Sequence, residues 1–140
     1  MLEIIGKVIH GEGYGQKLGF PTANLDRRDF SRRRLKVKLG VWAGVAKIES
    51  NIPSPHPLPQ GRGENVKIYK AGIVIGPIDH RGLPKIEAHL IDFRGNLYGK
   101  YLDIYLYRYI RPFKKFKNEE ALKQQIKLDI QRVRELELKK

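Results

Sequence analysis

The residues best suited to chemistry fall in one short stretch near the N-terminus, Gly11 to Leu25. Its first half holds four glycines, Gly11, Gly13, Gly15 and Gly19, and its second half holds Pro21, Thr22 and Asn24. Glycine tolerates positive φ and lets a ligand approach the main chain, so the first half can wrap closely over a bound molecule. Proline fixes its own φ and favours extended geometry in the preceding residue, so the second half is expected to be stiff and extended.

Thr22 and Asn24 are two positions apart, and residues at that spacing share one face of an extended segment. A hydroxyl and a carboxamide pointing the same way offer neutral oxygen ligands, which suit Mg²⁺ because this ion keeps phosphate and water in its shell. The alternative is a glycine-rich hairpin in which the threonine and asparagine hydrogen-bond a turn. The spacing alone leaves both interpretations open. No Gly-x-x-x-x-Gly-Lys-Ser/Thr motif occurs, so any nucleotide binding must use a different device.

Composition narrows the class of protein. A chain of 140 residues is expected to form a single domain, residues 1–140, with no cysteine framework. No apolar run reaches the ~20 residues that cross a bilayer, and the N-terminus lacks the features of a signal peptide, so a cytoplasmic protein without a membrane partner is expected. The formal net charge of +13 favours an anionic partner: a nucleic acid, an acidic membrane surface or a phosphorylated small molecule.

The hydrophobic pattern predicts mostly β-structure. Alternating or β-branched runs indicate strands at 2–8, 40–50, 66–75, 85–93 and 101–110, the fourth closing on a turn at 94–96. The basic segment 26–38 is interpreted as a loop with one irregular turn, and 53–63 as an exposed proline-rich connector. A helix is expected after Asn118, a good N-cap, with apolar residues at helical spacing. Strands joined by turns, with one final helix, predict an antiparallel barrel or sandwich with the helix packed across it.

Several motifs, taken in order, resemble the riboflavin kinase (flavokinase) family, whose domain also forms the C-terminal half of bacterial bifunctional FAD synthetases. The resemblance spans nearly the whole chain and is sharpest in Gly-Phe-Pro-Thr-Ala-Asn, residues 19–24. It continues through Gly-Val-Trp-Ala at 40–43, Ile-Glu-Ala-His-Leu-Ile-Asp-Phe at 86–93, Leu-Tyr-Gly at 97–99, Arg111, Phe116 and the helix that follows. It implies a six-stranded antiparallel Greek-key barrel with a C-terminal α-helix. It also implies transfer of the ATP γ-phosphoryl to the ribityl 5′-hydroxyl of riboflavin, giving FMN and ADP.

The resemblance assigns roles to particular residues. Thr22 and Asn24 match the positions that bind Mg²⁺ and the nucleotide phosphates, and Glu87 matches the carboxylate that takes the hydroxyl proton. Nucleotide binding is assigned to the glycine-rich stretch, that is Gly11, Gly13, Gly15, Gly19 and Pro21. Arg111 is expected either on the flavin side of the site or in a structural ion pair, for which Asp129 is the candidate partner. The family pattern differs at Gln16, where an arginine is common, and at 76–80, which only partly replaces a Pro-Thr-Phe-like element.

Two further hypotheses stay open from the residues. One is a non-catalytic basic β-barrel that binds single-stranded nucleic acid, suggested by the charge and by Tyr105, Tyr107 and Tyr109 on one predicted strand face. The other is a degenerate kinase fold that binds flavin or nucleotide without turnover. The sequence leaves the oligomeric state undetermined.

Overall fold

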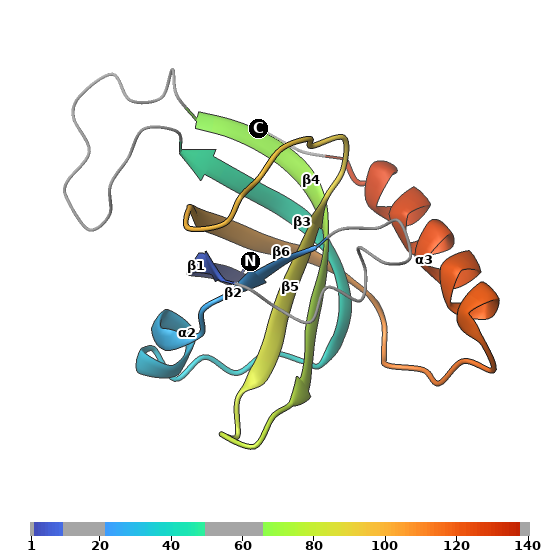
Figure 1. Ribbon diagram of the computed structural model, residues 1–140, viewed down its shortest axis with the longest axis horizontal. Coiled ribbons are helices and arrows are strands. Elements are labelled where there is room, and N and C mark those ends of the chain that lie inside the picture. The colour runs from blue at the N-terminus through green and yellow to red at the C-terminus, as the bar shows by residue number, and fades with distance from the viewer. Residues whose placement is uncertain (1, 10–21, 50–65, 138–140) are drawn as a thin grey trace.

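The computed structural model describes residues 2–9, 22–49 and 66–137 (Figure 1). Its elements are β1 (Leu2–Ile9), β2 (Ala23–Leu25), α2 (Arg28–Arg32), β3 (Gly40–Glu49), β4 (Val66–Ile78), β5 (Pro84–Leu90), β6 (Tyr101–Arg111) and α3 (Glu119–Arg134). The strands close into a barrel in the order β1-β2-β5-β4-β3-β6, and all neighbouring pairs are antiparallel. Because β6 returns to lie beside β3 after the run β3-β4-β5, the topology is a Greek key, as expected.

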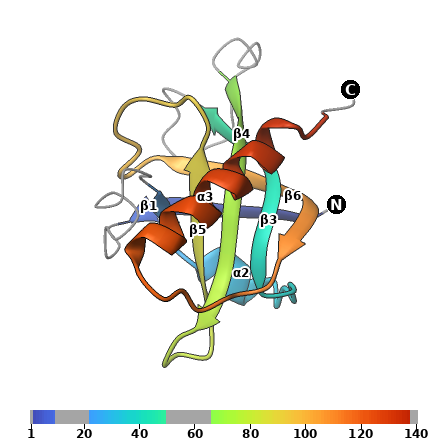
Figure 2. The same ribbon diagram turned by 90° about the vertical axis from the view of Figure 1, so that its right-hand side faces the viewer.

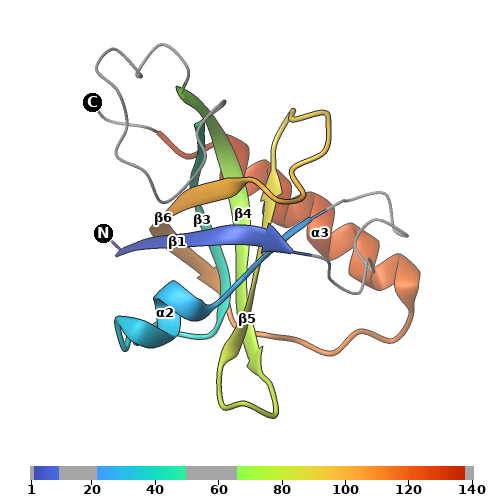
Figure 3. The same ribbon diagram turned by 60° about the vertical axis from the view of Figure 1, so that its left-hand side comes forward.

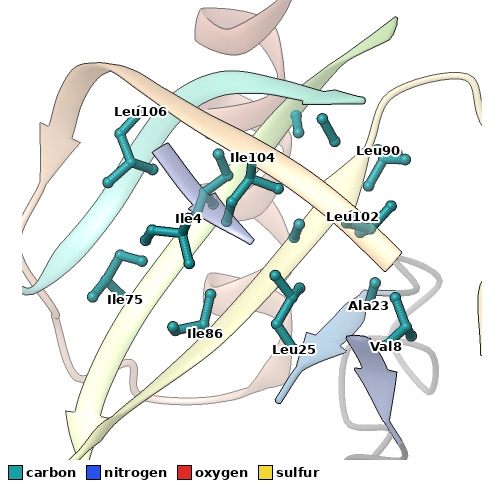
Figure 4. Close-up of a cluster of buried hydrophobic side chains, with 14 of the residues drawn as sticks. Ile4, Val8, Ala23, Leu25, Ile75, Ile86, Leu90, Leu102, Ile104 and Leu106 are labelled. Atoms are coloured by element: carbon teal, nitrogen blue, oxygen red, sulfur yellow. The ribbon is translucent and has the colours of Figure 1, made fainter. Parts of the chain in front are cut away.

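The barrel core is formed by the alternate, inward-facing residues of all six strands. Ile4, Ile73, Ile75, Leu102 and Ile104 are completely buried. Figure 4 shows such side chains from different strands converging on the barrel interior. Full burial of one such side chain stabilises the fold by about 1.5–3 kcal/mol. Since the strand period is two, the intervening residues must face outward, which fixes the side of the wall on which a polar site can form.

Helix α3 packs on the outer face of the barrel across β4 (Figure 2). Its N-cap is Asn118, whose side-chain oxygen accepts a hydrogen bond from the N–H of Ala121 at 2.8 Å, as the sequence indicates. Beneath the helix, small outward-facing residues allow a close approach. Ala43 is buried against Val133, and a Cβ built on Gly72 would lie 3.7 Å from the same valine.

An ion pair fastens α3 to β6. The Nε atom of Arg111 donates to Asp129 at 3.0 Å, and its NH2 group donates to the same carboxylate at 2.8 Å. Gln125 also donates to Asp129, at 3.1 Å. Both charged side chains are largely buried, and the pairing confirms the partner expected for Asp129. The geometry is that of a forked guanidinium–carboxylate contact, which holds the helix in one register on the barrel.

The basic segment 26–38 was expected to be a loop with one irregular turn, and the structure has a short regular helix in place of that turn. Residues 28–32 form the short helix α2, with Asp29 in its first turn. Arg32 and Arg33 both pair with Asp29, at 2.8 and 3.1 Å, which supports the turn locally. Phe30 is 5% exposed and belongs to the barrel core. A single buried aromatic residue within a charged run therefore anchors this segment, and it is too short to show helical periodicity.

Several expected strand boundaries also shift by one to three residues. Strand β4 continues through Gly76–Pro77, joined by a cis peptide bond, to Ile78, although this dipeptide was expected to close it. Strand β5 ends at Leu90 rather than Phe93, because Asp92 has positive φ (64°) and the backbone turns there. The earliest strand extends one residue further than expected, to Ile9.

The predicted tyrosine face of β6 is not formed. Two register shifts against β3, one between Val41 and Trp42 and one between Ala43 and Gly44, insert extra residues into β6. Only the shift between Ala43 and Gly44 lies between Tyr105 and Tyr109, and this one bulge reverses the alternation, so Tyr109 turns inward. Its ring packs edge-on against Trp42 with centroids 5.2 Å apart, and its hydroxyl donates to the carbonyl of Leu39 at 2.8 Å. Tyr105 instead bonds two carboxylates on the outer face, so no row of stacking tyrosines exists on this strand.

Candidate active site

The candidate site lies on the outer wall of the barrel where β2 pairs with β5. Asn24 is directly opposite Glu87, and Ala23 is opposite Ala88. Both alanines are buried in the core. Since neighbouring residues in a strand point to opposite faces, Asn24 and Glu87 must point outward together, and Thr22 falls on the same face. Residues 65 positions apart in the chain are thus brought together by one short strand pair.

Thr22 and Glu87 are in contact across this pair. The hydroxyl of Thr22 lies 3.5 Å from Oε2 of Glu87, at the long end of the hydrogen-bonding range. The two groups are therefore neighbours rather than a tightly held pair. All three side chains, Thr22, Asn24 and Glu87, are half-buried. The arrangement groups a hydroxyl, an amide and a carboxylate on one wall of the barrel. The spacing of the residues predicts the shared face of Thr22 and Asn24, and the family resemblance implies Glu87 beside them.

Two residues beside Glu87 add polar groups that the sequence analysis did not assign to the site. Strand β5 alternates strictly between buried and half-buried residues, which places Lys85, Glu87 and His89 together on the outer face. Continuing the register of β2 and β5 by one residue sets Thr22 opposite His89. The sequence already indicated this grouping, because Lys85, Glu87 and His89 are alternate residues of one predicted strand and so share a face. Lys85 brings a positive charge to the same face as the carboxylate.

Part of the predicted site lies outside the described residues. Gly11, Gly13, Gly15, Gly19 and Pro21 belong to this part, as does Gln16. The proline-rich connector 53–63 lies outside it as well. The assignment of these glycines and of Pro21 to nucleotide binding stays a prediction.

Arg111 is the last residue of β6, a strand that pairs with neither β2 nor β5. Its guanidinium is engaged by Asp129, and its NH1 group donates to the carbonyl of Pro112 at 3.2 Å. The ring of Phe116 lies 5.8 Å from the guanidinium carbon. These contacts account for the side chain as a structural ion pair, the second of the two roles expected for it.

The oxygen donors at the site suit a hard cation. Within residues 2–9, 22–49 and 66–137, no group of three or more histidine, aspartate or glutamate side chains could hold a metal. The hydroxyl of Thr22, the amide oxygen of Asn24 and the carboxylate of Glu87 are all hard oxygen ligands. Mg²⁺ is commonly held by one or two protein oxygens together with substrate phosphates, so this donor set fits Mg²⁺ better than Zn²⁺ or copper.

Neither helix in the described part of the chain is long and apolar enough to cross a bilayer.

The fold and the site together define a class: a closed Greek-key barrel that carries a hydroxyl–amide–carboxylate set on its outer wall. The family model described as "Flavokinase: Riboflavin kinase" matches residues 1–137. The chain belongs to the riboflavin kinase family.

Sequence relatives agree with this assignment. The bifunctional riboflavin kinase/FMN adenylyltransferase of Buchnera aphidicola (from Schizaphis graminum) is 33% identical over 131 residues, which cover 94% of this chain and 37% of that protein. The enzyme of the same name from Escherichia coli strain K12 is 32% identical over 126 residues, covering 90% of this chain and 35% of that protein. The chain therefore spans a little over a third of the length of these relatives.

Solved structures show the same fold. Riboflavin kinase from Trypanosoma brucei superposes with a TM-score of 0.66 at 26% identity, covering 95% of this chain and 74% of that one. A structure described as a macrolide-efflux protein from Streptococcus pneumoniae superposes with a TM-score of 0.74 at 26% identity, covering 97% of this chain and 39% of that one.

Proposed function

We propose that this chain is an ATP-dependent riboflavin kinase that transfers the γ-phosphoryl group of ATP to the ribityl 5′-hydroxyl of riboflavin. In the reaction the 5′-oxygen forms a bond to the γ-phosphorus while the bond from that phosphorus to the β–γ bridging oxygen breaks. The products are FMN and ADP. The observation that carries the proposal is the grouping of Thr22, Asn24 and Glu87 on one outward face of the β2–β5 pair, at the positions where the family motif has them.

Glu87 is proposed as the general base. A carboxylate aimed outward from a rigid strand can accept the hydroxyl proton as the 5′-oxygen attacks phosphorus. The hydroxyl of Thr22 lies 3.5 Å from this carboxylate, which supports a site in which the proposed phosphate ligand and the proposed base are neighbours. Because phosphoryl transfer depends mainly on positioning and charge neutralisation, a rigid barrel wall is a suitable scaffold.

Thr22 and Asn24 are proposed to hold Mg²⁺ and the nucleotide phosphates through their side-chain oxygens. When bound, Mg²⁺ supplies neutralisation of the charge on the transferring phosphoryl group. Lys85, on the same face, adds a fixed positive charge near the phosphates. The glycine-rich stretch Gly11 to Gly19, with Pro21, is proposed to bind the nucleotide through backbone N–H groups. A flavin contact from Arg111 stays a prediction, and its contacts favour the structural role.

Direct assay of the purified chain tests the proposal. With Mg²⁺, ATP and riboflavin, ADP release should require riboflavin, and FMN should form in equal amount, measured by chromatography with fluorescence detection. Thr22→Val removes the hydroxyl while keeping the branched shape, and it should raise the Mg²⁺ concentration needed for half-maximal rate. ATP and flavin binding without any FMN would instead support the degenerate kinase.

The alternative of a barrel that binds single-stranded nucleic acid depended on a row of tyrosines on β6, and β6 does not present such a row. Stacking would need aromatic rings aligned on one face, whereas Tyr109 packs inward against Trp42. The cytoplasmic location expected from the sequence stays a prediction.

A further inference from the structure

A cavity of about 420 Å³ opens between the end of β1, helix α2 and the turn that joins β4 to β5. Figures 1 and 3 show α2 and this turn on the same side of β1. The polar residues that line the cavity are four arginines, one serine and one aspartate: Arg27, Arg28, Arg32, Arg81, Ser31 and Asp26. We refer to this cavity as the arginine pocket.

The arginine pocket has an excess of positive charge. Four guanidinium groups and one carboxylate line it, and Asp79 and Asp29 neutralise two of these arginines from just outside the lining, so a net charge of +1 remains. The three arginines from the α2 side have acidic neighbours, whereas the guanidinium of Arg81 has no ion-pair partner within the described part of the chain. Arg28 is 94% exposed and only loosely paired, with Nε 3.4 Å from Asp26. Arg81 and Arg28 can therefore bind a ligand without breaking a strong ion pair.

The frame of the pocket is held rigidly by Arg27 and Asp79. Arg27 forms an ion pair with Asp79 and donates to the carbonyl of Leu83 at 3.3 Å. Asp79 accepts from the backbone N–H of Arg81 at 2.8 Å. Burial opposes ionisation of this carboxyl, but the hydrogen bonds from Arg27 and the backbone hold the pKa of Asp79 at about 2. The ion pair thus persists at all physiological pH values, and it presents Arg81 from a fixed turn.

The arginine pocket adjoins the candidate active site but is distinct from it. Ile9, which lines the pocket, pairs with Asn24 across β1 and β2. Asp26 follows Asn24 by two positions, about 7 Å further along the chain at the usual strand rise. Thr22, Asn24 and Glu87 are not among the residues that line the pocket, so the two sites are neighbours with different side chains.

We propose that the arginine pocket binds a phosphoanion. A guanidinium group presents a planar fork of N–H donors that matches phosphate oxygens in bidentate fashion, and the hydroxyl of Ser31 adds one further donor. Two sources share this chemistry: free inorganic phosphate or pyrophosphate, and the polyphosphate of a nucleotide whose remainder lies at the neighbouring site. The inference rests on the cavity and its charges, and it holds whether or not the chain is a riboflavin kinase.

Calorimetric titration of the full chain with pyrophosphate, without nucleotide or metal, tests the proposal. Saturable binding at one site is expected at about 50 mM salt, and it should weaken as salt rises because the pocket is open to solvent. Arg81→Gln and Arg28→Gln should each weaken binding about fivefold to tenfold. The control is Arg94→Gln, which removes the same charge from the loop at the opposite end of β5 (Figure 1) and should leave binding unchanged.

Titration with ATP separates the two sources. If pyrophosphate and ATP compete, and Arg81→Gln weakens both, the pocket takes the polyphosphate of a nucleotide. If pyrophosphate and ATP bind at the same time, and Arg81→Gln weakens only the binding of pyrophosphate, the pocket takes a free anion. Absence of saturable pyrophosphate binding at low salt would overturn the proposal, as would an Arg94→Gln variant weakened as much as Arg81→Gln. A thermal melt of each variant verifies that the fold is intact.

Discussion

Glu3, Asp103 and Tyr105 form a cluster on the outer face of the seam between β1 and β6, and its protonation makes barrel stability depend on pH. The Tyr105 hydroxyl lies 2.9 Å from Oε2 of Glu3 and 2.9 Å from Oδ2 of Asp103. One hydroxyl hydrogen cannot serve two carboxylates, so one carboxyl must supply a second hydrogen. Burial, followed by the hydrogen bond with Glu3, raises the pKa of Asp103 to about 7, although Lys47 opposes the rise. The hydrogen bond from Asp103 lowers the pKa of Glu3, aided by Arg33.

The sign and size of the effect follow from the raised pKa of Asp103. A carboxyl that titrates near 3.8 when unfolded and near 7 when folded contributes stability below pH 4 and loses it as pH rises through 7. The full difference corresponds to at most about 4 kcal/mol in the free energy of unfolding. Asp103 is only half-buried, and solvent screening reduces the expected effect to about 1–2 kcal/mol.

Asp103→Asn keeps the shape of the side chain and removes its titration. Urea unfolding followed by Trp42 fluorescence should show similar stability for wild type and variant near pH 4, and a variant more stable by about 1–2 kcal/mol at pH 8. Asp92→Asn is the control, because Arg134 lowers the pKa of Asp92 and reverses the sign. Its contribution is present at pH 8 and is lost in acid, and asparagine tolerates the positive φ there. Parallel pH profiles for wild type and Asp103→Asn would refute the reasoning.

Other predictions concern packing. Asp129→Ala leaves Arg111 buried without its carboxylate and should lower the free energy of unfolding, measured by urea titration, by about 3–5 kcal/mol. Arg134→Gln breaks an ion pair that is exposed to solvent and should lower it far less. Equal losses would contradict the anchoring role of the buried pair. Gly44→Ala should destabilise the barrel by about 1–3 kcal/mol because its Cβ would collide with a carbonyl of β6, but Gly72→Ala should be tolerated beneath α3. The opposite ranking in thermal melts would show that these glycines do not set the packing distances.

Local chemistry made the final helix and most strands predictable. Asn118 is a good N-cap in both sequence and structure. Along Pro84–Leu90 the alternation of apolar residues in the sequence matches the alternation of buried and half-buried residues in the strand. The grouping of Thr22 and Asn24 follows from the same strand period. That Glu87 lies opposite Asn24 depends on a pairing of distant strands, which no local pattern encodes. The family resemblance supplied that contact before the structure showed it.

The remaining differences have tertiary causes. The turn at Phe30 is helical because one aromatic side chain reaches the core, and a five-residue helix has no period to detect. The bulges in β6 depend on how β3 packs against it, so an unbroken alternation in sequence gave the wrong face for Tyr109. The arginine pocket combines residues of α2 with Arg81 from a turn some fifty positions away. The net charge of the sequence shows that the chain is basic, but it does not show which arginines lie together.

Single-turnover FMN formation by Glu87→Gln tests the central claim most directly. Glu87→Gln keeps the size of the side chain but removes the base, so the rate should fall about 100-fold or more while ATP binding is retained. Glu135→Gln, the same change at an exposed position after α3, should react at the wild-type rate. A Glu87→Gln enzyme that forms FMN as fast as wild type would contradict the assignment of the β2–β5 face as the site of phosphoryl transfer.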